Sequence, residues 1–211
     1  MPLIKLKQQL PQWSEVTYIE IIDLTPGEVK EFVTGSPKEL IFIAEGIAGY
    51  KPGINDNPVD FQSITEGSII DASGYRVVTI YPEDFVKMIR IGGFWKDETG
   101  TRGFFSLEKS DSPKNDGDPA PYDHERNTVF DNHFHDFDEY WIIYEGKGKA
   151  VSEGRFYDVQ AGDCIATQKG HYHDFPFVHE TIKGIWFETT LLGEKRLGHL
   201  WKRNLKHSNE L

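Results

Sequence analysis

Cysteine is almost absent from this chain, since Cys164 is the single cysteine among 211 residues. A lone cysteine excludes an internal disulfide framework and is typical of a protein of the reducing cytoplasm. No apolar run approaches the ~20 residues that a membrane span requires. The N-terminal stretch MPLIKLKQQL also lacks the apolar core of a signal peptide. We therefore expect a soluble, cytoplasmic protein without a membrane partner.

Positive charge is also scarce. The chain has 23 lysine and arginine residues against 34 aspartate and glutamate residues, which gives a formal net charge of −11 at pH 7. No basic stripe interrupts the middle of the chain, and the main positive cluster lies near the C-terminus, in 194–206. This balance argues against nucleic acid as a partner and leaves a small molecule as the expected ligand.

Short segments rich in β-branched and aromatic residues recur along the chain, each bounded by glycine, proline, asparagine or aspartate. The clearest are Val16–Asp23, Glu39–Glu45, Tyr75–Tyr81, Glu139–Glu145 and Ile182–Thr190. Many short strands separated by turn residues predict an all-β sandwich or barrel. One short helix is expected over 194–206, where leucines and a tryptophan form an apolar stripe.

A segment full of aspartate, proline, asparagine and glycine, 109–126, divides the chain into two strand-rich halves. A short pattern repeats across this division at an offset of 100. Glu39 and Gly46 enclose LIFIAE in the first half, and Glu139 and Gly146 enclose YWIIYE in the second. We interpret the pattern as an internal duplication.

Histidine and acidic residues gather in the second half of the chain. His133 and His135 are two positions apart, so on an extended strand they point to the same side. Glu139 follows them, and Gly170-His171-Tyr172-His173 supplies a further histidine. Three imidazoles and one carboxylate suit one divalent transition metal (Fe, Mn, Ni, Cu or Zn) and leave room for water or substrate. The alternative is a solvent-facing histidine pair on an edge strand.

These residues resemble the motifs of the cupins. The first cupin motif is glycine, five residues, His-x-His, three or four residues, glutamate, six residues and glycine. From Asn127 to Gly146 this chain reads N-TVFDN-HFH-DFD-E-YWIIYE-G, which departs only at Asn127. The second motif is glycine, five residues, Pro-x-Gly, two residues, histidine, three residues and asparagine. From Gly162 to Phe177 this chain reads G-DCIAT-QKG-HY-H-DFP-F, with Gln168 for proline and Phe177 for asparagine.

The resemblance implies a double-stranded β-helix, the jelly-roll barrel of the cupins, in two fused repeats with one metal. The glycine spacing of the second motif favours His173 over His171 as the fourth ligand. The metal ligands implied are therefore His133, His135, Glu139 and His173.

The domain organisation follows from the same resemblance. Residues 1–108 form a degenerate repeat without metal ligands, because Val33 and Gly35 stand at the positions of the two motif histidines. Residues 109–126 form a linker or a lid loop. Residues 127–211 form the metal-binding repeat with a C-terminal extension, and a homodimer is the expected assembly.

Strand alternation predicts which side chains line the metal pocket. If Glu139 points into the barrel, the expected lining residues are Trp141, Ile143, Phe175 and Phe177. A register slip of one residue would invert this assignment. An aromatic pocket beside a metal suits a compact molecule with an enolate, diketone or hydroxycarbonyl group.

Three classes of function fit these patterns. The favoured one is a metalloenzyme of the dioxygenase type, acting on a small oxygenated or dicarbonyl-like molecule. The alternatives are a metal-dependent isomerase or decarboxylase of a small carbohydrate or organic acid, and a non-catalytic ligand-binding cupin. An isomerase needs a base beside the substrate carbon, and the sequence does not identify such a residue.

Overall fold

The protein is described from a computed structural model that covers residues 3–5, 9–54, 57–58, 61–113, 124–130 and 132–191. Within these residues the chain contains strands and turns but no helix, and accordingly no helix that could cross a membrane. The structure confirms the predicted all-β class. The helix expected over 194–206 lies outside the described residues, as does most of the segment 109–126.

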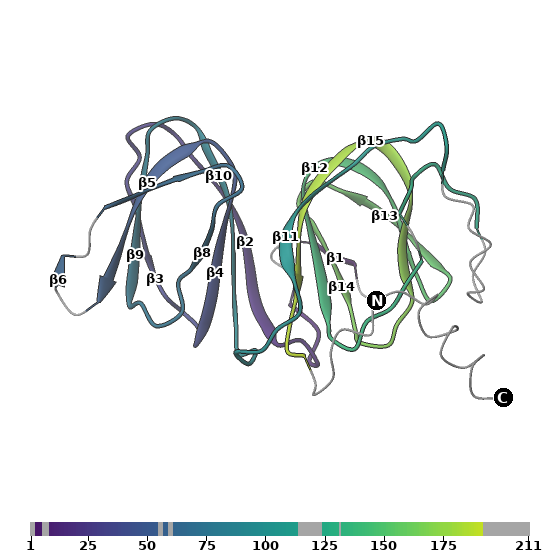
Figure 1. Cartoon of the computed structure of the whole chain (residues 1–211), viewed down its shortest axis with the longest axis horizontal. Helices are drawn as coiled ribbons and strands as arrows, with labels where there is room; N and C mark the ends of the chain where they lie inside the picture. The colour runs from purple at the N-terminus through teal and green to yellow at the C-terminus, as the bar shows by residue number, and fades with distance from the viewer. Residues whose placement is uncertain are drawn as a thin grey trace. The chain divides into compact units, whose positions relative to one another are not determined.

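The chain divides into two compact units. The C-terminal unit contains residues 96–211 together with 1–13, and the N-terminal unit contains residues 14–95. Figure 1 shows each unit as a set of strands wrapped around its own interior.

A six-stranded sheet forms the C-terminal unit, in the order β1-β14-β12-β15-β11, with β13 paired to β12. Its strands are β1 (Leu3–Lys5), β11 (Arg102–Leu107), β12 (Glu139–Ser152), β13 (Arg155–Gln160), β14 (Asp163–Thr167) and β15 (His173–Glu188). The long strands β12 and β15 pair antiparallel from Glu139–Glu188 at one end to Ser152–His173 at the other. The pairing of β12 with β14, which places Glu139 opposite Thr167, brings the two predicted motifs together.

Alternating side chains of these strands build the hydrophobic core of the C-terminal unit. Trp141 and Ile143 of β12 pack with Phe175 and Val178 of β15 and with Ile165 of β14. The lone cysteine, Cys164, is buried and free as expected, and burial raises the pKa of its thiol. It is therefore an inert core residue.

Two sheets form the N-terminal unit. One has the order β2-β10-β4-β8, and the other β3-β9-β5-β6 with β7 paired to β5. The strands are β2 (Val16–Leu24), β3 (Lys30–Val33), β4 (Lys38–Glu45), β5 (Ile47–Ile54), β6 (Asn57–Pro58), β7 (Gln62–Thr65), β8 (Ile69–Asp71), β9 (Val77–Pro82) and β10 (Val86–Gly93). Their inward side chains, such as Ile41, Ile43, Val78, Ile80 and Met88, form a separate core.

The compact units do not follow the predicted boundary at residue 108. Strands β1 and β11 belong to the segment 1–108, yet β1 pairs with β14 and β11 pairs with β15. These contacts join residues far apart in the sequence, so local patterns carried no sign of them. Two parts of the predicted domain organisation stay predictions: the repeat over residues 1–108 and the linker or lid loop over residues 109–126.

The same backbone hydrogen bonds recur in the two units. The Gly67 amide donates to the Ile43 carbonyl at 2.9 Å, and the Gly162 amide donates to the Ile143 carbonyl at 2.9 Å. Gly46 and Gly146 both have a positive φ, 88° and 82°; Gly46 lies between β4 and β5, and Gly146 lies within β12. The backbone around the two glycines at an offset of 100, Gly46 and Gly146, is thus similar in the two units.

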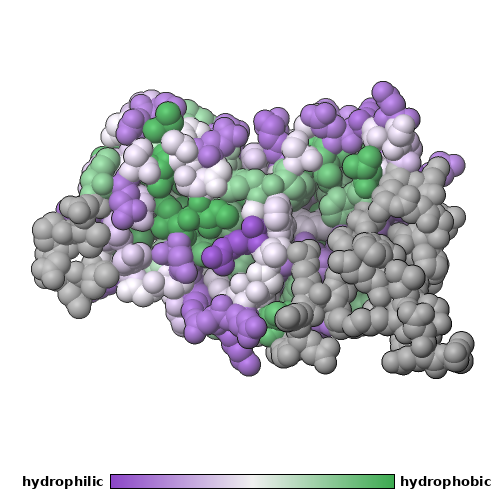
Figure 2. All heavy atoms as spheres, viewed as in Figure 1, coloured by the Kyte–Doolittle hydropathy of each residue, from purple (hydrophilic) through white to green (hydrophobic). Residues whose placement is uncertain are grey.

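The surface is mixed rather than uniformly polar. On the face shown in Figure 2, hydrophobic side chains gather in patches between hydrophilic ones. Exposed large hydrophobic residues include Val33, Phe61, Phe85 and Phe94. Scattered exposure of this kind is ordinary for a folded protein.

Candidate metal centre

The two motifs meet where β12 begins and β15 begins. His133 and His173 form an isolated antiparallel bridge. The His133 amide donates to the His173 carbonyl at 3.0 Å, and the His173 amide donates to the His133 carbonyl at 2.8 Å. The Gly170 amide donates to the His135 carbonyl at 2.7 Å, which fixes the second motif loop against the first. Backbone pairing therefore brings His133 and His135 next to His173.

Four side chains converge at this point: His133, His135, Glu139 and His173. One ligand atom from each lies within 4.8 Å of the others. Nε2 of His173 lies 2.7 Å from Oε2 of Glu139, and Nε2 of His135 lies 3.3 Å from the same oxygen. All four residues are buried, with at most 5% of their surface exposed.

The charges within the cluster hold Glu139 ionised. Burial alone would raise the pKa of its carboxyl, but hydrogen bonds from His135 and His173 lower the pKa well below its usual value. Burial lowers the pKa of His173, whereas the hydrogen bond to Glu139 outweighs that effect and raises it. The carboxylate is therefore in the form that binds a cation.

Neighbouring groups orient the cluster. The indole N–H of Trp141 donates to Oε1 of Glu139 at 2.8 Å. Nδ1 of His173 lies 2.9 Å from the carbonyl oxygen of His171, which can only accept, so this nitrogen carries the hydrogen and Nε2 faces the cluster. His135 stacks on Phe137 with ring centroids 4.7 Å apart. Such contacts fix ligand orientation in metal sites.

His171, the alternative ligand, is not part of the cluster. It lies in the turn before β15, and the residues brought together are His133, His135, Glu139 and His173. His171 contributes its backbone carbonyl to the orientation of His173 instead.

A cavity of about 250 Å³ opens beside the cluster within the C-terminal unit. It is lined by His133, His135 and Glu139 and otherwise mostly by aromatic or aliphatic side chains. The remaining lining residues are Thr101, Phe105, Leu107, Phe130, Trp141, Phe175, Trp186 and Glu188. Of the predicted lining residues, Trp141 and Phe175 are therefore present, while Ile143 and Phe177 are not.

A β-bulge explains the position of Phe177. On β12, Lys149 and Val151 are two positions apart, but their partners Phe177 and Asp174 on β15 are three apart. The extra residue turns Phe177 out of the inward row, and Val178 takes the core position. Ile143 lies one inward position beyond Trp141 and packs in the hydrophobic core.

Glu188 is a cavity residue that sequence reasoning missed. It lies at the end of β15, directly opposite Glu139 of β12, and only 1% of its surface is exposed. The Thr101 amide donates to its Oε2. Glu188 belongs to no motif, and only the register of β12 against β15 would have indicated it.

Asp174 forms a second buried group beside the cluster. Its Oδ2 lies 2.8 Å from Nε2 of His124 and 3.0 Å from a terminal nitrogen of Arg126. Only 9% of the His124 side chain is exposed. Asp174 follows His173 directly, so this ion-pair group anchors the start of β15.

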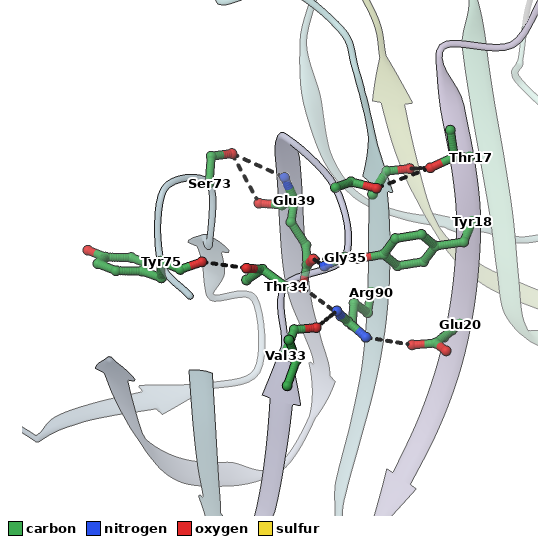
Figure 3. A network of polar contacts seen from close by, with 12 residues as sticks. Thr17, Tyr18, Glu20, Val33, Thr34, Gly35, Glu39, Ser73, Tyr75 and Arg90 are labelled. Atoms are coloured by element: carbon green, nitrogen blue, oxygen red, sulfur yellow. Dashed lines mark hydrogen bonds and ion pairs between the residues drawn. The ribbon is translucent and has the colours of Figure 1, made fainter. Parts of the chain in front are cut away.

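The N-terminal unit has a different arrangement at the corresponding positions (Figure 3). Glu39 is fully buried, and Nε of Arg90 lies 2.6 Å from its Oε1. Arg90 also donates to the Val33 carbonyl at 2.8 Å, and the Gly35 amide donates to Glu39 at 3.2 Å. The hydroxyl of Tyr18 donates to Glu39 as well. A guanidinium thus neutralises this carboxylate.

The residues of the C-terminal cluster fit a divalent transition metal. Three imidazoles and one ionised carboxylate are donors that such metals accept, and the four donor atoms are close enough to share one ion. The cavity beside them leaves space for water or a ligand at the same ion.

Comparison with known proteins agrees with this fold. The uncharacterized protein y4oW of Sinorhizobium fredii is 34% identical over 204 residues, which cover 96% of this chain and 91% of that protein. The family model described as the AraC-like ligand binding domain matches residues 120–192. This match contains the four residues of the cluster.

Solved structures show the same architecture at low identity. A variant of the oxalate decarboxylase OxdC from Bacillus subtilis has a TM-score of 0.61 and 11% identity, covering 99% of this chain and 84% of that chain. AerE from Microcystis aeruginosa has a TM-score of 0.58 and 9% identity, covering 84% of this chain and 89% of that chain. The chain shares its fold with these solved structures, and it belongs to the same family as y4oW of Sinorhizobium fredii.

Proposed function

We propose that this protein binds one divalent transition metal through His133, His135, Glu139 and His173 and uses it to bind a small oxygenated molecule. The observation that carries the proposal is the buried cluster of four donors, three of which, His133, His135 and Glu139, line the cavity. The metal would act as a Lewis acid toward the oxygen atoms of the bound molecule.

The N-terminal unit is, on this proposal, a second cupin copy without a metal. Its support is the recurrence of the turn hydrogen bonds and of the buried glutamate. Val33 pairs with Val77 across β3 and β9 as His133 pairs with His173. Two of the ligand positions therefore hold valines, and the guanidinium of Arg90 binds Glu39.

We infer a reaction of the dioxygenase type as the first candidate. The aromatic side chains around the cluster exclude water and shape a pocket for a compact, partly apolar molecule. Trp141 keeps Glu139 oriented toward the other donors. Two coordination positions on a six-coordinate metal would serve substrate and dioxygen.

A metal-dependent isomerase or decarboxylase is the second candidate, and Glu188 is the observation that favours it. This buried carboxylate lies in the cavity without belonging to the donor cluster, so it stands where such reactions need a proton-transfer group. The B. subtilis oxalate decarboxylase, similar in fold, contains Mn(II) centres.

A non-catalytic ligand-binding role is the third candidate. The match of residues 120–192 to an AraC-like ligand binding domain favours it. In this case the metal would hold the ligand without turning it over.

Metal loading followed by ligand screening separates these candidates. The purified protein is stripped with a chelator, reloaded in turn with Fe(II), Mn(II), Ni(II), Cu(II) and Zn(II), and assayed for bound metal. We expect about one equivalent, and a loss of most of it in His135→Ala. Oxygen consumption with hydroxycarbonyl compounds indicates a dioxygenase, and turnover without it indicates an isomerase or decarboxylase. Binding without turnover indicates a ligand-binding protein. Failure of every metal to bind would refute the proposal.

A further inference from the structure

We propose that the cavity of the C-terminal unit selects ligands that bind metal through two oxygen atoms and carry at most one negative charge when bound, and that Glu188 excludes ligands that carry two negative charges. The inference rests on the proposed function, because it takes the four-residue cluster as a metal site. It adds how much negative charge a ligand can carry, and it names Glu188 as the residue that limits this charge.

Glu188 shares the inward face of the sheet with the candidate ligand Glu139. The two residues are direct partners in the register of β12 and β15. Side chains of directly opposite residues lie on the same face of a sheet, with Cβ atoms about 4.5–5.5 Å apart. Both residues line the cavity. A ligand that reaches the metal cluster therefore lies beside the carboxylate of Glu188.

The residues around Glu188 hold its carboxylate in a fixed position. The Thr101 amide donates to its Oε2, and the hydroxyl oxygen of Thr101 accepts from the indole N–H of Trp186 at 3.1 Å. Gly100 leaves the space that Glu188 occupies, since a Cβ at Gly100 would overlap its carboxylate. The turn before β11 thus holds the Glu188 side chain at the cavity.

The charges at the cavity oppose a dianionic ligand. The carboxylates of Glu139 and Glu188 would balance the charge of a divalent metal bound by three neutral imidazoles. The described residues that line the cavity include neither lysine nor arginine. A dianion would therefore add two uncompensated charges to a buried site, where charge interactions are strong.

The walls of the cavity favour an apolar body on the ligand. Five aromatic side chains line it, namely Phe105, Phe130, Trp141, Phe175 and Trp186. Flat apolar surfaces stack on such rings, whereas small anions gain little from them. A hydroxyketone on an aromatic or similar ring combines two metal-binding oxygens with such a surface.

Calorimetric titration with two chelating probes tests the proposal. The probes are maltol, a hydroxypyranone that loses one proton and chelates as a monoanion, and oxalate, a dianion of similar chelating geometry. They are titrated into the Mn(II)-loaded full-length protein, into Glu188→Gln and into Glu180→Gln. The glutamine at 188 keeps an oxygen that can accept from Thr101. Glu180, on the same strand, is the matched control, because its exposed carboxylate pairs with Lys147 at the surface.

The expected result has two parts. Wild type and Glu180→Gln bind maltol at least tenfold more tightly than oxalate, and Glu188→Gln tightens oxalate binding by about tenfold or more. Manganese content is measured on the same samples and stays near one equivalent in all of them.

Two results would overturn the inference. Equal affinity of wild type for the two probes, or an oxalate affinity unchanged in Glu188→Gln at full metal content, would contradict the role of Glu188. Absence of manganese from wild type would instead refute the proposed metal site, and this inference with it.

Discussion

At the scale of single residues, Glu39 and Glu139 show how one residue type serves two purposes. Each is buried near the start of its strand, β4 or β12. Glu139 is contacted by two histidines, whereas Glu39 is bound by Arg90. A buried carboxylate needs a positive partner. Arg90 is the partner of Glu39, and a metal ion is the proposed partner of Glu139.

Replacing Arg90 tests the importance of this ion pair. In Arg90→Met, the carboxylate of Glu39 remains buried without its guanidinium, so we expect a loss of about 3–5 kcal/mol in the free energy of unfolding. Urea denaturation measures this change. The control Lys87→Met lies on the same strand, and its ion pair with the half-exposed Asp23 should contribute less than about 1 kcal/mol. A double variant that also carries Glu39→Met should recover stability relative to Arg90→Met.

We expect Trp141 to strengthen metal binding by holding Glu139 in place. Trp141→Phe keeps an aromatic ring in the cavity but removes the N–H that donates to Glu139. Loss of such an orienting contact should weaken metal binding by about 10–100-fold. Competition with a metal-binding dye measures the affinity. Trp186→Phe, which loses only a bond to Thr101, should keep the wild-type affinity.

The sequence predicted the residues of the cluster better than those of the cavity. His133, His135 and Glu139 are close in sequence, so strand geometry brings them together. Glu188 and Thr101 come from strand ends far apart in the chain. Their approach depends on the pairing of β15 with β12 and β11, which no local pattern shows.

At the scale of elements, glycines with a positive φ shape the backbone of the C-terminal unit. Gly146, with φ 82°, lies within β12 against the backbone of Thr181. Gly162, with φ 90°, has open space around its missing side chain. The backbone conformation alone explains the glycine at 162. At 146, the close approach of the Thr181 backbone is a second reason for a glycine.

These two glycines give a matched pair of variants. Gly162→Ala should cost about 1–2 kcal/mol, because only the left-handed backbone opposes it. Gly146→Ala should cost about 1–3 kcal/mol more, because its Cβ would also overlap the Thr181 carbonyl. Thermal unfolding monitored by circular dichroism measures both. Equal costs would show that the contact with Thr181 relaxes freely.

Strand positions were predictable from sequence, but strand register was not. The predicted segments Val16–Asp23 and Glu39–Glu45 agree with β2 and β4 within one residue. The bulge between Asp174 and Phe177 gives no signal in hydrophobic alternation, so Phe177 was placed in the pocket. An extra residue in one strand inverts every later side chain.

At the scale of the whole molecule, the protein concentrates its candidate chemistry in one of its two units. The donor cluster and the cavity lie in the C-terminal unit. The N-terminal unit has its own core and a buried ion pair.

The predicted homodimer is open to analytical ultracentrifugation, in which a dimer would sediment at twice the chain mass of 24.2 kDa.

The metal content of purified protein tests the central claim most directly. Elemental analysis compares wild type with His173→Ala and with His171→Ala, a histidine two residues away that lies outside the cluster. We predict about one equivalent of a divalent transition metal in wild type and in His171→Ala, and loss of most of it in His173→Ala. Full metal content in His173→Ala, or none in reconstituted wild type, would contradict the account.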